Sequence, residues 1–399
     1  MKTHSDIAKN DVTLIIPTYN RPKLLSRLLN YYAAKKSNLS FIILDSSNQE
    51  LRESNSQACS VLGNQAQYIT FPSTMPVAAK LLEGLNITKT RFCAFCADDD
   101  LVFLEGLKAA TSFLKNNDDY VCADGIYLNF GEVGHDIQLH VEYASHGITA
   151  NDPGARVFNL YQKYESLFYG VYRIEHALAI FNSVSKNASL HYQELFQATS
   201  ALLLGKSHRL VEFYAARQSC APADTTRDKW QTYYWFADNT KEFIEHYLIY
   251  RNELWEFYQK HCSITSHSQT SFFHIMDLAH AMYFGLGCPP EYFHTMLQSK
   301  WPADLFKKPN IHRDNIYNQL KSPRQLAFEN RIEKWITWLH NKKSALYSNR
   351  YIKSLNSEIK KTTNISWNCV LNPELRWLAK VDIFRKSYHE LCQYISLSS

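Results

Sequence analysis

Short apolar runs alternate with amphipathic segments over the first 130 residues of the chain. Four runs are rich in β-branched or aromatic residues and are followed by proline or polar residues, as expected for buried strands: residues 12–16, 41–44, 67–71 and 91–96. Apolar residues at helical spacing predict helices over residues 22–32 and 77–85, and a proline lies at or just before the start of each. This alternation predicts an α/β fold, a mixed, mostly parallel sheet flanked by helices, with ligands beyond the carboxyl ends of its strands.

The pattern changes after Asp228. Aromatic residues become frequent, and helical spacing predicts long helices over residues 230–258, 271–284 and about 323–361. Glycines and prolines between residues 285 and 290 predict a break in this series. We therefore expect two parts: an α/β domain over residues 1–227 and a mainly α-helical region over residues 228–399.

Composition excludes several classes of protein. A chain of 399 residues that is 45% hydrophobic can bury a sizeable core, so a disordered protein is not expected. No apolar run approaches the roughly 18 residues that a membrane span needs, and the first ten residues lack the apolar stretch of a signal peptide. Nine scattered cysteines suit reduced thiols, so we expect a cytoplasmic protein.

Charge is distributed unevenly. The net charge is +5, but residues 300–399 carry +10 and residues 1–299 carry −5. Trp335 and Trp338 lie on a basic predicted helix in this C-terminal region, a pattern typical of helices on an anionic bilayer. We expect the basic region to hold the protein at the inner face of the cell membrane; packing of the helix on the rest of the protein is the alternative. No motif supports nucleic-acid binding.

The strongest local signal is Asp98, Asp99 and Asp100, which directly follow the fourth predicted strand. Three adjacent carboxylates repel one another unless a cation lies among them. Oxygen ligands favour Mg²⁺ or Mn²⁺, which bind one or two protein carboxylates together with phosphate oxygens of a substrate. The alternative is a solvated acidic loop that caps a helix over residues 101–114. The position at the carboxyl edge of the sheet favours the metal site.

Cys93 and Cys96 precede the aspartates on the same strand. Residues three apart on a strand point to opposite faces of the sheet, so the two sulfurs cannot share a metal or form a redox pair without distortion. We expect both to be small core residues.

Three segments, in this order, resemble the family-2 glycosyltransferases, which have the nucleotide-sugar-binding GT-A fold: residues 12–21 (VTLIIPTYNR), 43–47 (ILDSS) and 95–100 (FCADDD). The resemblance covers roughly residues 11–220. It implies that residues 1–227 form a Rossmann-like GT-A catalytic domain that binds a nucleotide-diphosphate sugar.

The resemblance also assigns roles to residues. It implies that Pro17, Thr18, Tyr19 and Asp45 hold the nucleotide, and that the three aspartates form an Asp-x-Asp motif. Asp98 and Asp100 would then hold a Mn²⁺ or Mg²⁺ ion on the diphosphate, and Asp98 and Asp99 would contact the donor. The family usually has a second acidic residue after the position of Asp45, and here it is Ser46. The identity of the base is therefore left open.

Several of these residues have a structural alternative. Asp45 lies in Asp-Ser-Ser-Asn, which is ordinary turn chemistry. Tyr19 could serve packing alone. Lys80 lies on the predicted helix before the aspartate strand and could reach a phosphate, or it could be solvated. Arg217 could hold phosphate oxygens of the leaving diphosphate with its planar fork, or form an ion pair within the protein.

A transferase that inverts the anomeric carbon needs a general base for the acceptor hydroxyl. The resemblance places this carboxylate near a helix start, where Glu194 lies in His-Tyr-Gln-Glu-Leu-Phe. The alternative for Glu194 is stabilisation of the helix dipole.

The combined prediction is a metal-dependent, inverting glycosyltransferase that acts on a glycan or lipid-linked acceptor in surface polysaccharide synthesis. A sugar nucleotidyltransferase is disfavoured because residues 17–21 contain no glycine, which the phosphate-binding loop of such enzymes needs. The alternative from another class is a non-catalytic nucleotide- or glycan-binding module on the same fold.

Overall fold

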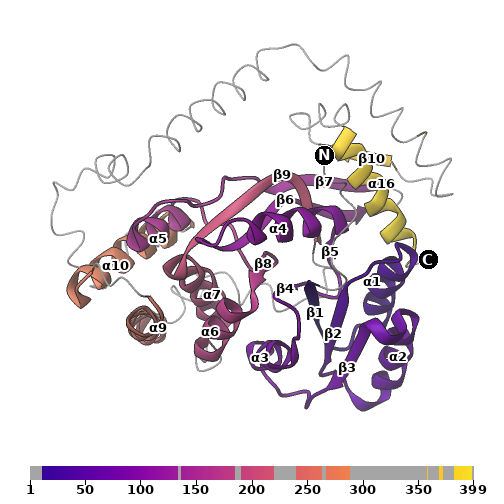
Figure 1. Ribbon diagram of the computed structural model, residues 1–399, viewed down its shortest axis with the longest axis horizontal. Coiled ribbons are helices and arrows are strands. Elements are labelled where there is room, and N and C mark those ends of the chain that lie inside the picture. Colours follow the sequence, from indigo (N-terminus) through magenta and orange to yellow (C-terminus); the bar gives the residue numbers. More distant parts are fainter. Residues whose placement is uncertain are drawn as a thin grey trace, which may run out of the picture.

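A computed structural model describes residues 11–133, 136–184, 190–219, 240–262, 267–287, 357, 368–371 and 382–397. Its centre is a mixed ten-stranded sheet in the order β10-β7-β6-β8-β4-β1-β2-β3, with β9 paired to β6 and β5 (Figure 1). The strands are β1 (Val12–Thr18), β2 (Ser40–Asp45), β3 (Ala66–Thr70), β4 (Phe92–Phe95), β5 (Leu101–Val102), β6 (Tyr120–Val133), β7 (Asp136–Tyr143), β8 (Val171–Arg173), β9 (Lys206–Gln218) and β10 (Asn368–Leu371).

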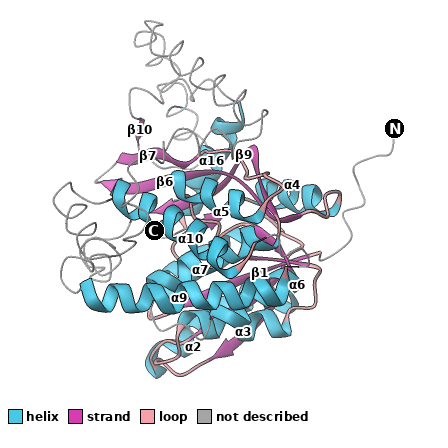
Figure 2. Ribbon diagram, turned by 90° about the vertical axis from the view of Figure 1, so that its left-hand side faces the viewer, coloured by secondary structure: helices cyan, strands magenta, loops and turns pink. Residues whose placement is uncertain are grey.

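Helices flank the sheet (Figures 1 and 2). They are α1 (Pro22–Ala34), α2 (Gln49–Cys59), the 3-10 helix η1 (Ser60–Gln65), α3 (Val77–Ile87), α4 (Leu104–Lys115), α5 (Pro153–Gln162), α6 (Ile174–Val184), α7 (Leu190–Leu204), α9 (Thr240–His261), α10 (Gln269–Gly287) and α16 (Asp382–Ser396). The helices α5, α6, α7, α9 and α10 gather at one end of the molecule, whereas α1, α2 and α16 lie at the other. The predicted α/β fold with a mixed sheet is confirmed.

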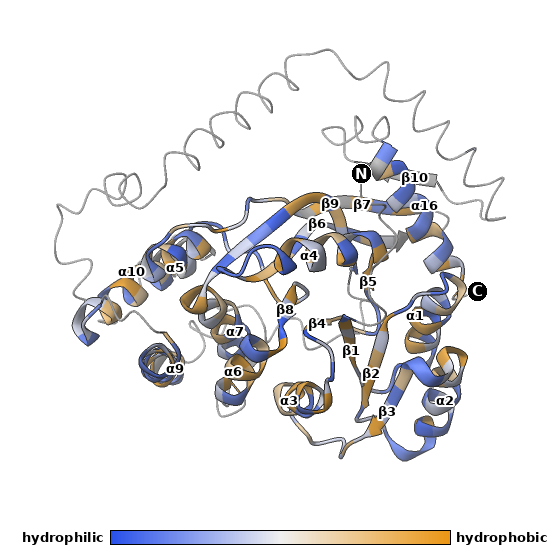
Figure 3. Ribbon diagram, in the orientation of Figure 1, coloured by the Kyte–Doolittle hydropathy of each residue, from blue (hydrophilic) through white to orange (hydrophobic). Residues whose placement is uncertain are grey.

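The four predicted strands form β1 to β4, which are paired in parallel. The apolar runs of β1, β2 and β4 are buried, and β1 places Leu14 and Ile16 in one core and Ile15 in the other. The expectation of a buried strand is wrong for β3, which lies at the edge of the sheet with half-buried and exposed residues. Cys93 and Cys96 are likewise buried in different cores, which confirms that they are core residues on opposite faces. Apolar segments line the sheet and the inner sides of the helices in Figure 3.

Two local predictions were wrong. Leu101 and Val102 were expected in a helix, but they form β5, which pairs antiparallel with Ala216 and Ala215 of β9. The helix α4 begins only at Leu104. The aspartates therefore lie in a short connection between two strands, β4 and β5, which holds them at both ends. The second difference is that α10 continues to Gly287, through part of the predicted break.

Helix α2 was not predicted, because its sequence, QELRESNSQAC, has few apolar residues to reveal a helical period. It packs against α1 and β3, where only Asn55 and Cys59 are buried.

Segments from the end of the chain rejoin the sheet and its helices. The strand β10 pairs in parallel with β7, and α16 packs against α1 and β9 (Figure 1). The predicted basic helix with Trp335 and Trp338 lies outside the described residues, and the boundary after residue 227 stays a prediction. None of the helices in the described ranges is both long enough and apolar enough to cross a membrane.

The contact between α4 and β9 yields a stability prediction. A Cβ on Gly106 of α4 would lie 2.9 Å from the carbonyl oxygen of Phe213 and 2.9 Å from the Cα of Tyr214. Because backbone cannot move aside cheaply, Gly106→Ala should destabilise the protein by about 1–3 kcal/mol. This would occur although alanine has a helix propensity better by about 1 kcal/mol. Urea unfolding followed by circular dichroism measures the change.

The matched control is Gly84→Ala in α3, where the new Cβ would meet only side-chain methyl groups of Leu44 and Ile15, at 3.0 and 3.1 Å. These can shift, so the cost should be smaller. A Gly106→Ala protein as stable as the wild type would show that α4 can move away from β9.

Candidate functional site

The site lies where β1, β2 and β4 end at the same edge of the sheet. Thr18 at the end of β1 is the register partner of Asp45 at the end of β2. Two hydrogen bonds join the loop after β1 to the loop after β2. The Asn20 backbone N–H donates to Ser47 Oγ at 2.8 Å, and the Asn48 N–H donates to Asn20 Oδ1 at 2.9 Å. Asn20 has a φ of 55°, a left-handed conformation that asparagine tolerates better than most residues.

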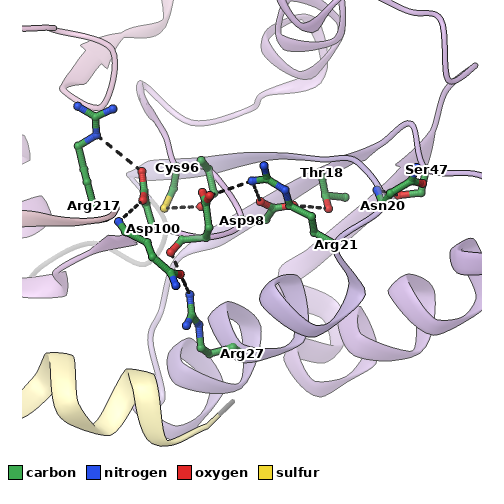
Figure 4. A network of polar contacts seen from close by, with 12 residues as sticks. Thr18, Asn20, Arg21, Arg27, Ser47, Cys96, Asp98, Asp100 and Arg217 are labelled. Atoms are coloured by element: carbon green, nitrogen blue, oxygen red, sulfur yellow. Dashed lines mark hydrogen bonds and ion pairs between the residues drawn. The ribbon is translucent and has the colours of Figure 1, made fainter. Parts of the chain in front are cut away.

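Asp98, in the connection between β4 and β5, is buried, with 3% of its surface exposed. The Thr18 hydroxyl donates to Asp98 Oδ2 at 2.7 Å, and Arg21 lies 3.4 Å from Oδ1 (Figure 4). Burial and the charge of Asp99 raise the pKa of Asp98 to about 6, although Thr18 and Arg21 oppose the rise. Positive charge therefore compensates the Asp98 carboxylate only in part.

Asp100 is also buried and makes contacts on the other side of the loop. Its Oδ2 accepts from the Tyr169 hydroxyl at 2.5 Å, and its Oδ1 accepts from the Gln218 backbone N–H at 2.7 Å. Arg217 Nε lies 3.9 Å from Oδ2. Burial, followed by the charge of Asp99, raises the pKa of Asp100 to about 7 despite the nearby Arg217.

Asp99 is more accessible and points to Arg21. Arg21 Nη1 lies 2.8 Å from Asp99 Oδ2, and Arg27 donates to the Asp99 backbone carbonyl at 3.0 Å. With Arg217, three arginines therefore surround the aspartates (Figure 4). The sequence predicted a cation among the carboxylates. Of the three arginines, only Arg217 was a predicted site residue.

The residues present fit a hard divalent cation. Asp98 and Asp100 supply oxygen ligands only, and their raised pKa values show that extra positive charge would stabilise both carboxylates. No group of three or more His, Cys, Asp or Glu side chains that could hold a metal occurs among the described residues. Two carboxylates with substrate phosphates nevertheless suffice for Mg²⁺ or Mn²⁺. Metal binding by Asp98 and Asp100 stays a prediction.

Asp45 is fully buried, and both of its oxygens are occupied by the protein. Oδ1 accepts from the Ser47 backbone N–H at 2.6 Å; Oδ2 accepts from Asn55 Nδ2 at 2.8 Å and from the Tyr68 hydroxyl at 2.5 Å. Burial alone would raise the pKa of Asp45, but these hydrogen bonds lower it below its usual range. Asp45 thus has the turn-forming role that the sequence analysis gave as the alternative, and direct contact with a nucleotide stays a prediction.

Lys80 is a buried cation beside the aspartates. It lies on α3, and its ammonium donates to Ser46 Oγ at 2.7 Å. Burial lowers the pKa of Lys80, while Asp45 and Asp98 oppose the shift and favour the charged form. The alternative of a solvated lysine is therefore wrong. Ser46 is the position where the resembling family has an acidic residue, and here it anchors Lys80.

Arg217 connects the aspartates to Glu194. Its guanidinium lies over the rings of Tyr143 and Tyr169, with centroid distances of 5.7 and 5.8 Å, and Nη1 donates to the Tyr143 hydroxyl at 2.9 Å. Burial would lower the pKa of Arg217, but Tyr169, Tyr143, Asp100 and Glu194 together raise it. The Arg217 guanidinium thus interacts electrostatically with both the Asp100 and the Glu194 carboxyl groups.

Glu194 lies in the second turn of α7, further from the helix start than expected. It accepts a hydrogen bond from the Tyr164 hydroxyl at 3.1 Å. Burial raises the pKa of Glu194 above its usual range; Tyr164, Arg217 and Ser166 oppose the rise. A carboxylate with a raised pKa, near a cation and partly accessible, is suited to accept a proton.

The other two predicted nucleotide contacts lie at the same edge. Pro17 is in register with Leu44, and Tyr19 is 49% exposed beside the loop of Asn20. The packing alternative for Tyr19 is disfavoured by this exposure. Sequence reasoning missed Tyr169, Arg21 and Arg27 as neighbours of the aspartates. Only the helix-start position of Arg21, next to residues 17–20, could have indicated one of them.

Comparisons with known proteins give a family match and several similar solved structures. Residues 13–174 match the family model described as glycosyl transferase family 2. No curated protein matches the chain. Among solved structures, S. aureus TarS 1–349 is similar at 13% identity and a TM-score of 0.42, covering 97% of this chain and 89% of that chain. Its complex with UDP-GlcNAc is similar at 14% identity and a TM-score of 0.44, with the same coverage of both chains. A further structure, S. aureus TarS, is similar at 15% identity and a TM-score of 0.36, covering 71% of this chain and 50% of that chain.

The raised pKa of Asp100 predicts how stability depends on pH. Because the folded-state pKa of about 7 exceeds the ordinary 3.8, the folded protein binds this proton more strongly than the unfolded chain. The carboxyl therefore costs stability as the pH rises from about 4 to 7. Without metal or nucleotide, Asp100→Asn should have a Tm higher than the wild type by roughly 2–5 °C at pH 8. The difference should shrink as the pH falls and become small at pH 4, near the ordinary pKa of 3.8.

Glu53→Gln, an exposed carboxylate on α2, is the control and should leave the Tm unchanged at both pH values. Differential scanning fluorimetry measures all three proteins. A lower Tm for Asp100→Asn at pH 8 would show that its contacts to Tyr169 and Gln218 outweigh the cost of the buried charge.

Proposed function

We infer that the protein is a glycosyltransferase that uses a nucleotide-diphosphate sugar, and the match of residues 13–174 to the glycosyl transferase family 2 model supports this inference. We propose that the reaction is metal-dependent and inverts the anomeric carbon, and that the acceptor is a glycan or a lipid-linked precursor in surface polysaccharide synthesis. The observation that carries the proposal is the pair of buried carboxylates, Asp98 and Asp100, held at the carboxyl edge of the sheet with cations on both sides.

The donor is expected to extend along this edge. The nucleoside would lie by the loops after β1 and β2, near Pro17, Thr18, Tyr19 and Asp45, where Thr18 and Asp45 are register partners. The diphosphate would then meet the aspartates. The Lys80 ammonium carries three N–H donors and donates one hydrogen bond to Ser46, so it would donate another to a phosphate oxygen.

Asp98 and Asp100 would hold the Mn²⁺ or Mg²⁺ ion. When bound, the ion supplies a Lewis acid that stabilises the leaving nucleoside diphosphate. Asp99 contributes negative charge that strengthens the attraction, and Arg21 keeps that charge oriented through its 2.8 Å contact. Arg217 would hold a phosphate oxygen from the opposite side, since its Nη1 is held by the Tyr143 hydroxyl at 2.9 Å and its Nε lies 3.9 Å from Asp100 Oδ2.

Glu194 would act as the general base. It would accept the proton of the acceptor hydroxyl as that oxygen attacks the anomeric carbon, while the bond to the diphosphate breaks. Tyr164 holds the carboxylate in place, and burial makes it more basic than an exposed glutamate.

The basic surplus of residues 300–399 suggests where the acceptor is met. Its charge of +10 would attract an anionic membrane surface, so we propose that the protein is cytoplasmic and attaches peripherally to the inner face of the cell membrane.

A donor screen tests the function. The full chain is incubated with a panel of nucleotide sugars, including UDP-GlcNAc, in Mn²⁺, in Mg²⁺ or in chelator, and release of nucleoside diphosphate is measured. One donor should be turned over with metal; turnover should be lost in chelator and in Asp100→Asn, and kept in Glu53→Gln. Equal turnover of Asp100→Asn in chelator contradicts the metal site. Binding of a donor without any turnover would favour a non-catalytic binding module.

Glu194→Gln tests the base. Glutamine keeps the size of the side chain and can still contact Tyr164, but it cannot accept the proton. Transfer to an acceptor should fall by about two to four orders of magnitude, whereas donor affinity should stay the same. The control is Glu175→Gln, an exposed carboxylate in the first turn of α6, with wild-type transfer expected. Unchanged transfer by Glu194→Gln would assign the base to another carboxylate.

A further inference from the structure

The C-terminal helix α16 contacts the aspartates directly. Its residue Tyr394 donates to the backbone carbonyl oxygens of Asp99 and Asp100, at 3.2 and 3.0 Å, across 294 positions of sequence from Asp100. A hydroxyl carries one proton, so the two carbonyls share it, and both are drawn to the same point. Tyr394 is fully buried. The yellow α16 lies beside this part of the site in Figure 4.

Arg27 completes the contact from α1. Its guanidinium lies over the Tyr394 ring, 4.3 Å from the centroid, and donates to the Asp99 carbonyl at 3.0 Å and to Gln218 Oε1 at 2.6 Å. The Gln218 backbone N–H in turn donates to the Asp100 carboxylate at 2.7 Å. Tyr394 and Arg27 therefore fix both the backbone of the aspartate loop and, through Gln218, the direction of the Asp100 side chain.

The helix that carries Tyr394 is itself anchored. Glu390 accepts from the Tyr31 hydroxyl at 3.0 Å and pairs with Lys35 at 3.0 Å, so one carboxylate joins α16 to two positions on α1. The Tyr31 and Tyr394 rings meet edge to face at 5.9 Å. At the other end of α16, Phe384 packs against Phe213 of β9 at 5.5 Å. These contacts hold α16 between α1 and β9.

The aspartate loop needs such support. It connects β4 to β5 in five residues, of which three in a row are acidic and two are buried. Their mutual repulsion favours any movement that separates the carboxylates or exposes them to water. The carbonyl contacts of Tyr394 oppose this movement without touching the carboxylates, which leaves the carboxylate oxygens to the ligand.

We propose that Tyr394 is a positioning residue that holds the Asp99–Asp100 backbone in the donor-binding geometry, so that α16 completes a site otherwise built from residues 11–219. The proposal rests on the proposed function for its kinetic consequences. Its structural part, restraint of the loop by a helix from the end of the chain, holds independently of any substrate.

The test is Tyr394→Phe, which removes only the hydroxyl. The matched control is Tyr388→Phe, a buried tyrosine on the same helix that stacks on Phe384, 6.1 Å between centroids. Hydrogen–deuterium exchange of the full chain without ligand should show faster exchange of the amides of residues 96–103 in Tyr394→Phe, by about fivefold to tenfold, the scale of one lost hydrogen bond. The control should match the wild type there.

Kinetics give the second readout. Tyr394→Phe should lower kcat and raise the Mn²⁺ concentration needed for half activation, each by about tenfold, while the KM for the acceptor stays constant. Tyr388→Phe should change none of these. A purely structural role of Tyr394 would lower the Tm of Tyr394→Phe and leave its metal requirement unaltered.

The outcomes separate the two proposals. Unchanged exchange at residues 96–103 in Tyr394→Phe overturns the positioning role, whatever the activity. Faster exchange with unchanged kcat and metal requirement also overturns it, because the restraint would then not matter to the reaction. If the wild type turns over no donor, the proposed function fails, and the exchange data still decide whether α16 restrains the loop.

Discussion

Three consecutive carboxylates in a buried loop are the constraint on which this part of the structure depends. Asp98 and Asp100 are almost completely removed from water, and Asp99 lies between them in sequence. Burial of a carboxylate costs free energy unless hydrogen bonds and opposite charges compensate it. The surrounding residues provide part of this compensation: Thr18 and Arg21 on one side, Tyr169 and Gln218 on the other. The raised pKa values show that compensation is incomplete.

The incomplete compensation of the Asp98 and Asp100 charges lowers the stability of the protein and leaves both carboxylates able to attract a cation. A site that fully satisfied its carboxylates would be more stable but would gain little from a cation or from a cation-bound diphosphate. The protein instead anchors the loop through its backbone. β5 pairs with β9, and Tyr394 and Arg27 bind the carbonyl oxygens of the loop, so the side chains stay oriented despite their repulsion. Such preorganisation lowers the cost of arranging the site when the ligand binds.

Short-range patterns were sufficient to predict the part of the fold that carries the site. Strands β1, β2 and β4 are continuous apolar runs ended by polar residues, so their burial and the shared edge of the aspartates followed from the sequence. The edge strand β3 is exposed in part, which its local pattern did not reveal. β5 was missed because two apolar residues after an acidic loop resemble a helix start, and only the partner strand β9, more than a hundred residues later, reveals the pairing. Tyr394 was missed for the same reason: no local pattern indicates a contact across 294 positions. The hydrogen bonds of the Asp45 side chain to Asn55 and Tyr68 could not be predicted either, because no local pattern brings these residues together.

The central claim is that the buried aspartates bind a divalent cation together with a nucleoside diphosphate. Isothermal titration calorimetry of the wild-type chain with UDP, GDP, CDP and ADP, each with and without Mn²⁺, tests it most directly. We predict that one nucleotide binds at least about tenfold more tightly with Mn²⁺, since each 1.4 kcal/mol of added interaction gives that factor. Mn²⁺ should have no effect on nucleotide binding in Asp98→Asn. Affinity that is the same with and without Mn²⁺ for every nucleotide would contradict the claim.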